Sequence, residues 1–479
     1  MRHASRWPIV MALAIAVPCR GRAQEPTETK TPPPVRLSLA QALEQALSHN
    51  DRLIDARDNL EQAGNGVRAA RSAFRPKVIP NILGSFGQTD ISNQNYRLDV
   101  TQRFTTGTEL RAGVGTTTQQ NQLGSYYDSE ANFALSQPLL RGFGRTVTRR
   151  SLTSAEIRLE DTRRQELQTE RQVTVEVVGA YYRLVAQKRL VLDAEKSLER
   201  ARQLLEASSA KLQAGKVSQL DVFRAQQLVA QAEGSLLDAQ GAVEDARDQL
   251  RFLMGRGYEY EFEVVDEIPL VQESIAAEDA IAIALRERPE LAAAQSAAQE
   301  AERSLSAARN QLLPQLDVNL AFAGRKTSED FGTSLKFENF KFNTFFAISL
   351  PGDRTTLSIE LHNALIERDR QRRQLHTLRL RITDEARRAA RELQRLLRTL
   401  EVADQSLDFA RQEAEVANLR FQRGLSNNLD LVNAEAGLLA AQSRRIGVLA
   451  ELAVARLGLR ATLGTLDPRR DILGDPQSS

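Results

Sequence analysis

The sequence is poor in the residues that build disulfide frameworks and metal centres: its 479 residues include one cysteine, one tryptophan and four histidines. A single cysteine excludes an intrachain disulfide. Three of the histidines, His49, His362 and His376, are isolated and lack the spacing of metal ligands. The sequence also lacks a glycine-rich phosphate loop, a nucleophile elbow and a pair of carboxylates placed for a catalytic cleft. We therefore expect no cofactor, no metal and no enzymatic activity, and a fold stabilised by packing alone.

Long apolar runs are missing beyond the N-terminus, which excludes a helical membrane protein. At the N-terminus, Arg2 and Arg6 precede a short apolar run and then small residues as far as Ala23. This pattern predicts a secretory signal peptide that is cleaved after Ala23, which also removes Cys19. The alternative, a lipid attached to Cys19, is disfavoured because Pro18 stands where lipid attachment requires a small residue.

An excess of charge of one sign is also absent. The 64 basic and 62 acidic residues give a formal charge of +2 and are spread along the whole chain. This balance excludes a dedicated nucleic-acid surface and is typical of solvated helix faces.

The strongest positive signal is an internal duplication. Residues 39–76 align without a gap with residues 277–314 at a constant separation of 238 residues, and Pro76 and Pro314 end the two copies. A second pair of motifs, "LQAGKVSQLDVFRAQ" and "FQRGLSNNLDLVNAE", matches at a separation of 209 residues. The chain is thus predicted to contain one structural unit twice.

Apolar residues in each copy follow the spacing of a left-handed coiled coil. This predicts a helical hairpin in each copy, with a long helix over residues 146–212 or 356–422 and a shorter return helix. A long helix of this kind spans roughly 100 Å, whereas the return helix and the proline-ended helix each span roughly 55 Å. Two short helices stacked end to end would therefore match one long helix. On the helices alone, a spectrin-like or tropomyosin-like rod is an alternative.

Between the helices, residues 77–138 and 314–351 change to an alternation of apolar and polar residues and gather aromatic side chains. Tyr96, Leu98 and Val100, for example, alternate with polar residues. The pattern is typical of a membrane β-barrel with a wet lumen, although a soluble β-sandwich also uses it. We expect two strands in each insert, with room in the longer first insert for a further hairpin around "FTTGTELRAG". Four strands are too few to close a membrane barrel, so closure requires several chains.

The order and spacing of these features resemble the TolC-like outer-membrane efflux family. The resemblance rests on the duplicated helices, "FALSQPLLRGFG" after the first strands, and the "AGKVSQLDV" and "RGLSNNLDL" turns. It implies a mainly α fold with a transmembrane β-barrel, in which a homotrimer closes a twelve-stranded barrel in outer-membrane lipid and continues it as an α-helical tunnel into the periplasm. It also implies docking to a periplasmic adaptor (membrane fusion) protein and to an inner-membrane transporter.

The resemblance places the periplasmic tip, where the adaptor docks, at the two glycine turns. The corresponding residues here are Gly215, Lys216 and Val217 in the first copy and Gly424, Leu425 and Ser426 in the second. Both glycines are also explained as helix C-caps, because glycine adopts the left-handed conformation at low cost.

Asp221 and Asp430 lie six residues after each glycine, where the family has an aspartate that keeps the tip shut and one that lines the entrance. Their alternative role is to stabilise a helix N-terminus, by about 0.3–1 kcal/mol each. Arg420 and Arg423 lie near the second glycine and are candidates to pair with Asp221.

The sequence departs from the family at three gate positions. Phe421 stands at the position of the gate tyrosine, Ser426 at that of the gate arginine, and Asn433 at that of a second entrance acid. A lock built on that tyrosine hydroxyl and that arginine is therefore excluded here.

These observations divide the chain into consecutive regions. They are a signal peptide (1–23), a first repeat (24–254, with strands at 77–138 and a long hairpin at 146–254), an equatorial connector (255–276), a second repeat (277–464, with strands at 314–351 and a hairpin at 356–464) and a C-terminal tail (465–479). Through the resemblance, the connector and the tail are expected to form a belt around the tunnel.

The predicted function is a passive outer-membrane exit duct for small molecules, with type I protein secretion as an alternative cargo route. A periplasmic coiled-coil adaptor or scaffold is an alternative of a different class. Such a protein would carry one hairpin and an inner-membrane anchor or lipid site, whereas this sequence has two hairpins and amphipathic strands.

Overall fold

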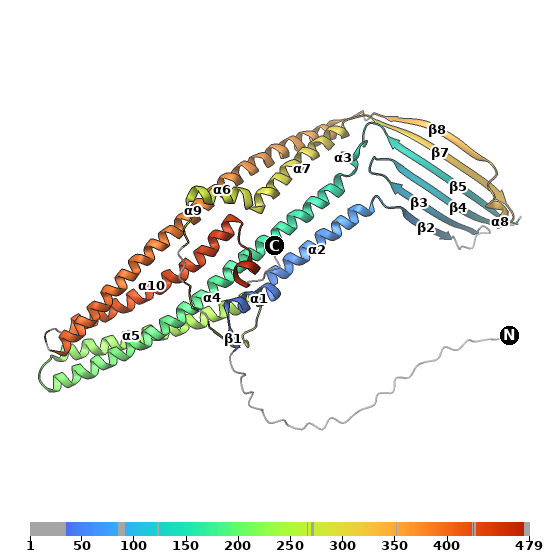
Figure 1. Ribbon diagram of the computed structural model, residues 1–479. Coiled ribbons are helices and arrows are strands. Elements are labelled where there is room, and N and C mark those ends of the chain that lie inside the picture. Colours follow the sequence, from blue (N-terminus) through green and yellow to red (C-terminus); the bar gives the residue numbers. More distant parts are fainter. Residues whose placement is uncertain are drawn as a thin grey trace, which may run out of the picture.

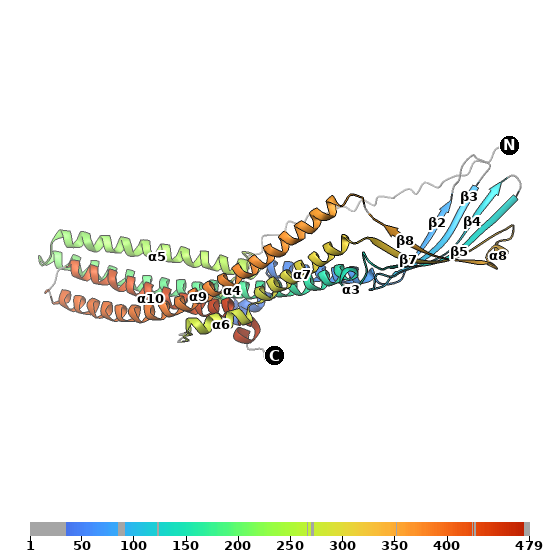
Figure 2. The same cartoon turned by 90° about the horizontal axis from the view of Figure 1, so that it is seen from above.

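The computed structural model describes residues 35–84, 92–121, 124–265, 267–269, 273–350, 352–423, 425 and 428–473. The predicted signal peptide lies outside these residues. The molecule is elongated, with a β-sheet at one end and the turns of two long helical hairpins at the other (Figures 1 and 2). None of the described helices combines the length and the apolarity needed to cross a membrane.

The helices of the two repeats follow the same plan. The first repeat contains α1 (Leu39–His49), α2 (Asp51–Ser72), α3 (Arg145–Thr148), α4 (Arg150–Gln213) and α5 (Gln219–Leu253); the second contains α6 (Ala277–Glu287), α7 (Pro289–Gln311), α9 (Thr355–Gln422) and α10 (Asn428–Leu463). A short π-helix, η1 (Arg469–Leu473), follows. The long helix α4 contacts α1, α2 and α5, and α9 contacts α6, α7 and α10. Each long helix is thus matched by shorter helices stacked along its length (Figure 1).

The single proline-ended helix expected in each repeat is in fact two helices, broken at Asn50 and Arg288, which are 238 residues apart. The Asn50 side chain caps α2 by accepting from the backbone N–H of Arg52 and donates to the Leu253 carbonyl oxygen at 2.8 Å. Arg288 precedes Pro289, whose ring disfavours the helical conformation for the residue before it. The apolar spacing continues through both breaks, so periodicity alone did not predict them.

Three apolar clusters stabilise the helical layer. One joins α1, α4 and α5, a second joins α6, α9 and α10, and a third joins the ends of both long hairpins. The two repeats therefore share a core at the end of the molecule farthest from the sheet.

The strands form one six-stranded antiparallel sheet in the order β2-β3-β4-β5-β7-β8, and our expectation of four strands was wrong. The first insert supplies β2 (Lys77–Gly84), β3 (Ser92–Arg103), β4 (Glu109–Asn121) and β5 (Gly124–Pro138); the second supplies β7 (Gln315–Ser328), the one-turn helix α8 (Phe331–Ser334) and β8 (Phe340–Ser349). The additional hairpin is β3–β4, which turns at "FTTGT" as the length of the insert allowed. Elsewhere, β1 (Val35–Leu37) pairs in parallel with β6 (Phe262–Val264).

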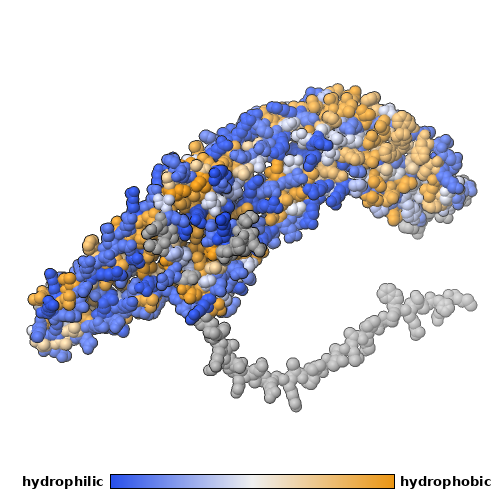
Figure 3. All heavy atoms as spheres, viewed as in Figure 1, coloured by the Kyte–Doolittle hydropathy of each residue, from blue (hydrophilic) through white to orange (hydrophobic). Residues whose placement is uncertain are grey.

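The register places apolar and polar residues on opposite faces of the sheet. One row across all six strands reads Val78, Val100, Ala112, Phe133, Phe322 and Phe342, and the next row reads Ile79, Asp99, Gly113, Asn132, Ala323 and Lys341. Apolar side chains gather over the sheet on the side shown in Figure 3, whereas the helical end is mostly hydrophilic. The alternation read from the sequence is therefore an alternation of two faces.

Candidate functional site at the helical tip

The turn between α4 and α5 is closed by a glycine C-cap. Gly215 has φ +69°, its N–H donates to the Leu212 carbonyl at 2.8 Å, and the Lys216 N–H donates to the Lys211 carbonyl at 2.8 Å. These two bonds are those of a Schellman motif. Lys216 is exposed and Val217 is half-buried. The first turn therefore projects a short, rigid loop from the end of the helical layer.

The turn between α9 and α10 has the same backbone bond at the equivalent place, where the Leu425 N–H donates to the Arg420 carbonyl at 2.9 Å. Leu425 is 72% exposed. Gly424 and Ser426 lie outside the described residues.

Asp221 stabilises the start of α5. Its backbone N–H donates to Ser218 Oγ at 3.3 Å, and its carboxylate accepts from the Ser218 N–H at 3.0 Å and from Ser218 Oγ at 2.7 Å, which is a reciprocal capping box. The hydrogen bond from the Ser218 hydroxyl is the main reason why the pKa of Asp221 is lowered. Arg224, one turn along the same helix, pairs with Asp221 at 3.5 Å. A pairing of Asp221 with Arg420 or Arg423 stays a prediction.

The remaining gate candidates lie on α9 and α10. Asp430 stands in the first turn of α10 and Asn433 follows one turn later, both with exposed side chains. Arg420 and Arg423 are exposed at the end of α9. Phe421 differs from its neighbours because it is only 4% exposed and packs in the core shared by the two hairpins.

A residue that the sequence analysis did not single out, Lys211, connects the two hairpins at this end. Its ammonium nitrogen lies 3.6 Å from the centroid of the Phe421 ring and donates to the Phe421 carbonyl oxygen at 2.5 Å. A cation above an aromatic face and at a helix C-terminus is stabilised by both. Burial, and to a smaller extent Lys216, lowers the pKa of Lys211. The sequence duplication could have identified Lys211, because it is the first-repeat equivalent of the gate candidate Arg420, 209 residues later.

The contact between the hairpins continues away from the tip. Arg200 of α4 pairs with Glu435 of α10 at 2.6 Å, and the Glu435 side chain is only 12% exposed. Lys211 and Arg200 therefore make two polar links from α4 to the second repeat. Any outward movement of one hairpin against the other must break them.

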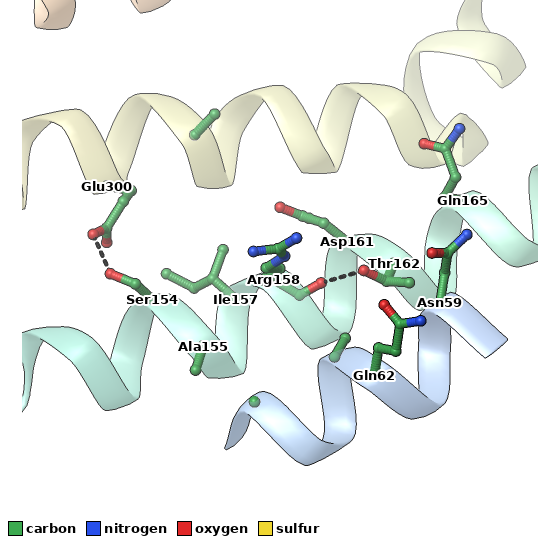
Figure 4. Close-up of a pocket in the computed structure, with 13 residues that line it drawn as sticks. Asn59, Gln62, Ser154, Ala155, Ile157, Arg158, Asp161, Thr162, Gln165 and Glu300 are labelled. Carbon is green, nitrogen blue, oxygen red and sulfur yellow. Dashed lines mark hydrogen bonds between the residues drawn. The ribbon is translucent and has the colours of Figure 1, made fainter. Parts of the chain in front are cut away.

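A polar groove lies between α2, α4 and α7, in the part of the helical layer nearer the sheet (Figure 4). Ser154 donates to Glu300 at 2.5 Å across the groove, and burial raises the pKa of Asp161, which pairs with Arg164 at 2.7 Å. Asn59 and Gln62 line it from α2. Within the described residues, no group of three or more acidic, histidine or cysteine side chains could hold a metal ion. The groove is thus a polar gap in the helical wall.

Comparisons with known proteins agree with this architecture. The family description "Outer membrane efflux protein" matches residues 42–256 and 280–465, and the two matched blocks begin 238 residues apart, the separation of the sequence repeat. The chain is 28% identical over 217 residues to the fusaric acid resistance protein FusA of Burkholderia cepacia, an alignment that spans 44% of this chain and 39% of that relative's length.

Solved outer-membrane channels share the fold. The outer-membrane channel OprN superimposes with a TM-score of 0.70 at 20% identity, covering 89% of this chain and 90% of that chain. The outer membrane protein VceC of Vibrio cholerae gives a TM-score of 0.69 at 18% identity, covering 89% and 96%. The chain therefore belongs to the outer membrane efflux protein family, as the sequence predicted.

Proposed function

We propose that three copies of this chain form the exit duct of a tripartite export system, and that the duct carries small molecules through the outer membrane. The observation that carries the proposal is the union, in one chain, of a two-faced antiparallel sheet with two long helical hairpins. The sheet supplies a membrane-spanning wall, and the hairpins extend the duct into the periplasm. The signal peptide directs the chain there and is removed after Ala23.

The edges of the sheet support assembly with further copies. In β2 and β8 every described residue is exposed, including Ile82, Leu83, Phe346 and Ile348. Unpaired backbone groups at a sheet edge are unfavourable in lipid, where only closed barrels satisfy all of them. Because the sheet has six strands of alternating direction, β8 of one copy is antiparallel to β2 of the next, and a ring of copies closes without a mismatch.

The helical tip supports docking to a periplasmic adaptor. Apolar side chains are exposed at both turns: Leu220 and Phe223 on α5, Leu425 in the second turn and Leu429, the equivalent of Leu220, on α10. Exposed apolar groups around rigid turns are typical of a protein interface. We assign the adaptor to this surface together with Gly215, Lys216 and Val217 and their second-repeat equivalents Gly424, Leu425 and Ser426.

The connector and the C-terminal segment form the proposed belt around the tunnel. Glu273 of the connector pairs with Arg456 of α10 at 2.6 Å, and Asp471 in η1 pairs with Arg460 at 3.0 Å. Arg251, with its side chain 7% exposed, pairs with Glu261 at 2.9 Å. These links hold the connector against the middle of the helical layer.

We propose a passive duct, so the energy for export comes from an inner-membrane transporter. The name of the Burkholderia cepacia relative favours resistance to a small organic acid over protein secretion as the role of the system. To test the proposal, the gene would be deleted in its host and the chain restored in trans. We expect deletion to lower resistance to exported toxic compounds and the purified mature protein to have the mass of a trimer in detergent. A monomer, together with unchanged resistance, would contradict it.

A further inference from the structure

The six-stranded sheet has a consequence for the width of the duct, and this consequence rests on the trimer of the proposed function. We infer that the outer-membrane barrel of this protein has eighteen strands, six from each of three copies, instead of the twelve that its family resemblance implies. The partner of each sheet edge is a second copy of this chain. The additional strands are the hairpin β3–β4.

Backbone pairing shows that β3 and β4 belong to the wall. β3 pairs with β4 from Ser92↔Gln120 to Arg103↔Glu109, and β4 pairs with β5 from Glu109↔Ser136 to Asn121↔Gly124. Both ladders run over the whole length of the strands. An insert that lay over the sheet or inside the lumen would lack this pairing.

The polar face is built around the additional hairpin. Arg97 of β3 pairs with Asp99 at 2.8 Å and also with Glu130 of β5, two strands away. Its side chain reaches Glu130 across β4 at Gly115, where a Cβ would lie 3.2 Å from Arg97 Cγ. At Gly113 a Cβ would lie 2.5 Å from Asn132 Oδ1 and 2.6 Å from Asp99 Oδ1. The glycines of β4 therefore make room for side chains that join the hairpin to β5.

The apolar face is continuous over the hairpin as well. Leu98 and Val114 are exposed there and align with Pro80 and Ala131 of the flanking strands. On the same face, Thr116 of β4 accepts from Ser129 of β5 at 2.9 Å, and Ser129 bonds to Ser334 of α8 at 2.7 Å. These buried hydroxyl groups are thus hydrogen-bonded to one another. Their contact with Ser334 places α8 on the apolar face, so α8 does not cover the polar face.

The turn between β3 and β4 lies at the end of the sheet nearest the helices. It is bonded to its neighbours there, although the hairpin is not connected directly to a helix. The Gly144 N–H donates to the Thr106 carbonyl at 3.3 Å, and Thr108 donates to Gln137. Gly107 has φ +99°, and a Cβ there would lie 2.8 Å from the Gly142 carbonyl oxygen. The turn thus packs closely against the connection from β5 to α3.

Barrel diameter grows nearly linearly with the number of strands at constant tilt. Eighteen strands therefore give a diameter about 1.5 times, and a cross-section about 2.25 times, that of a twelve-stranded barrel. The helical plan is unchanged, because the additional strands carry no helices. We infer that the outer-membrane mouth admits bulky cargo and that the helical tip sets the size limit.

The direct test is electron cryomicroscopy of the purified wild-type trimer in lipid nanodiscs. We expect eighteen strands in the barrel. A trimer with a twelve-stranded barrel and the β3–β4 hairpin outside the wall would overturn this inference and leave the proposed function intact. A protein that forms no trimeric pore would overturn both.

A second test measures the width of the mouth. Ser136→Cys places a thiol on the polar face near the helical end of β5, and Leu135→Cys places one on the apolar face as a matched control. Intact cells would be treated with maleimide polymers of graded size, in the full chain and in a variant lacking residues 92–121. We expect Ser136→Cys in the full chain to react with polymers of about 1.5-fold larger radius than in the deletion variant, and Leu135→Cys to react with none. An equal size limit in both backgrounds would overturn the inference; if the deletion variant does not fold, the strand count decides.

Discussion

The link between Lys211 and Phe421 predicts how the closed tip is held. Our hypothesis is that this link, which joins the two hairpins of each chain, takes the place of a lock made by a tyrosine hydroxyl and an arginine. The perturbation is Lys211→Met, which keeps the apolar stem and removes the ammonium group. It abolishes both the contact with the Phe421 ring and the bond to the Phe421 carbonyl.

The magnitude follows from the geometry. A cation above an aromatic ring contributes about 0.5–2 kcal/mol, and a hydrogen bond from a charged donor about 1.5–3 kcal/mol. Burial lowers the pKa of Lys211, so holding the charge at this place has a cost that offsets part of the gain. We take about 1 kcal/mol as the net loss per chain. In a trimer that opens in one step, the loss of about 3 kcal/mol shifts the closed-to-open ratio on the order of 100-fold.

The assay is single-channel recording of the purified protein in planar bilayers, without an adaptor. We expect Lys211→Met to raise the open probability strongly, and Lys216→Met, which removes an exposed charge five residues later, to leave it unchanged. An open probability of Lys211→Met equal to that of wild type would refute the reasoning. So would an equal increase in both variants, because the effect would then come from charge alone.

Three further predictions concern the turn and the sheet. Gly215→Ala forces a non-glycine residue to φ +69° and should destabilise the tip by about 1 kcal/mol, measured by amide exchange. The control Gly234→Ala lies inside α5 with open space around it and should be neutral or stabilising. Equal effects of the two substitutions would contradict the left-handed cap at Gly215. The Asp221 carboxylate has a lowered pKa, so its stabilisation is present above the ordinary value of 3.8 and is lost as the pH falls through the lower folded-state pKa. Ser218→Ala should therefore lower the opening free energy at the start of α5, measured by amide exchange, by about 1 kcal/mol at neutral pH. The difference should shrink in strong acid, where the bonds to the carboxylate weaken and only the bond from the Asp221 N–H to Ser218 Oγ is kept; a pH-independent difference would argue against the capping box. Gly113→Ala should lower the heat stability of the detergent-resistant oligomer, because the new methyl group overlaps Asn132 and Asp99; an unaltered melting point for Gly113→Ala would count against the packed polar face.

The long helices could be predicted from the sequence to within a few residues because coiled-coil spacing is a local signal that repeats many times. α9 was expected at residues 356–422 and spans Thr355–Gln422. The breaks at Asn50 and Arg288 were missed because the apolar spacing runs through them, although Pro289 offered a signal at the second.

The number of strands was harder to predict than the helices. β4, "ELRAGVGTTTQQN", is rich in glycine and threonine and shows little contrast between its faces, and β2 contains Pro80 within an apolar run. The glycines of β4 gain meaning only when Arg97 and Asp99 are seen to reach across them from β3. Such a requirement comes from a neighbouring strand and leaves no periodic trace in the sequence.

The site residues divide in the same way. Gly215 and Asp221 could be found because cap and turn chemistry is encoded within a few residues. The Lys211 link could not be found locally, because its partner lies 210 residues away on the other hairpin.

The central claim, an outer-membrane export duct, is tested most directly by fractionation of the host's membranes followed by conductance measurement on the purified protein. We predict that the mature chain is recovered in the outer-membrane fraction and forms ion-conducting pores in planar bilayers. Recovery with the inner membrane or the soluble periplasm, without conductance, would contradict the account.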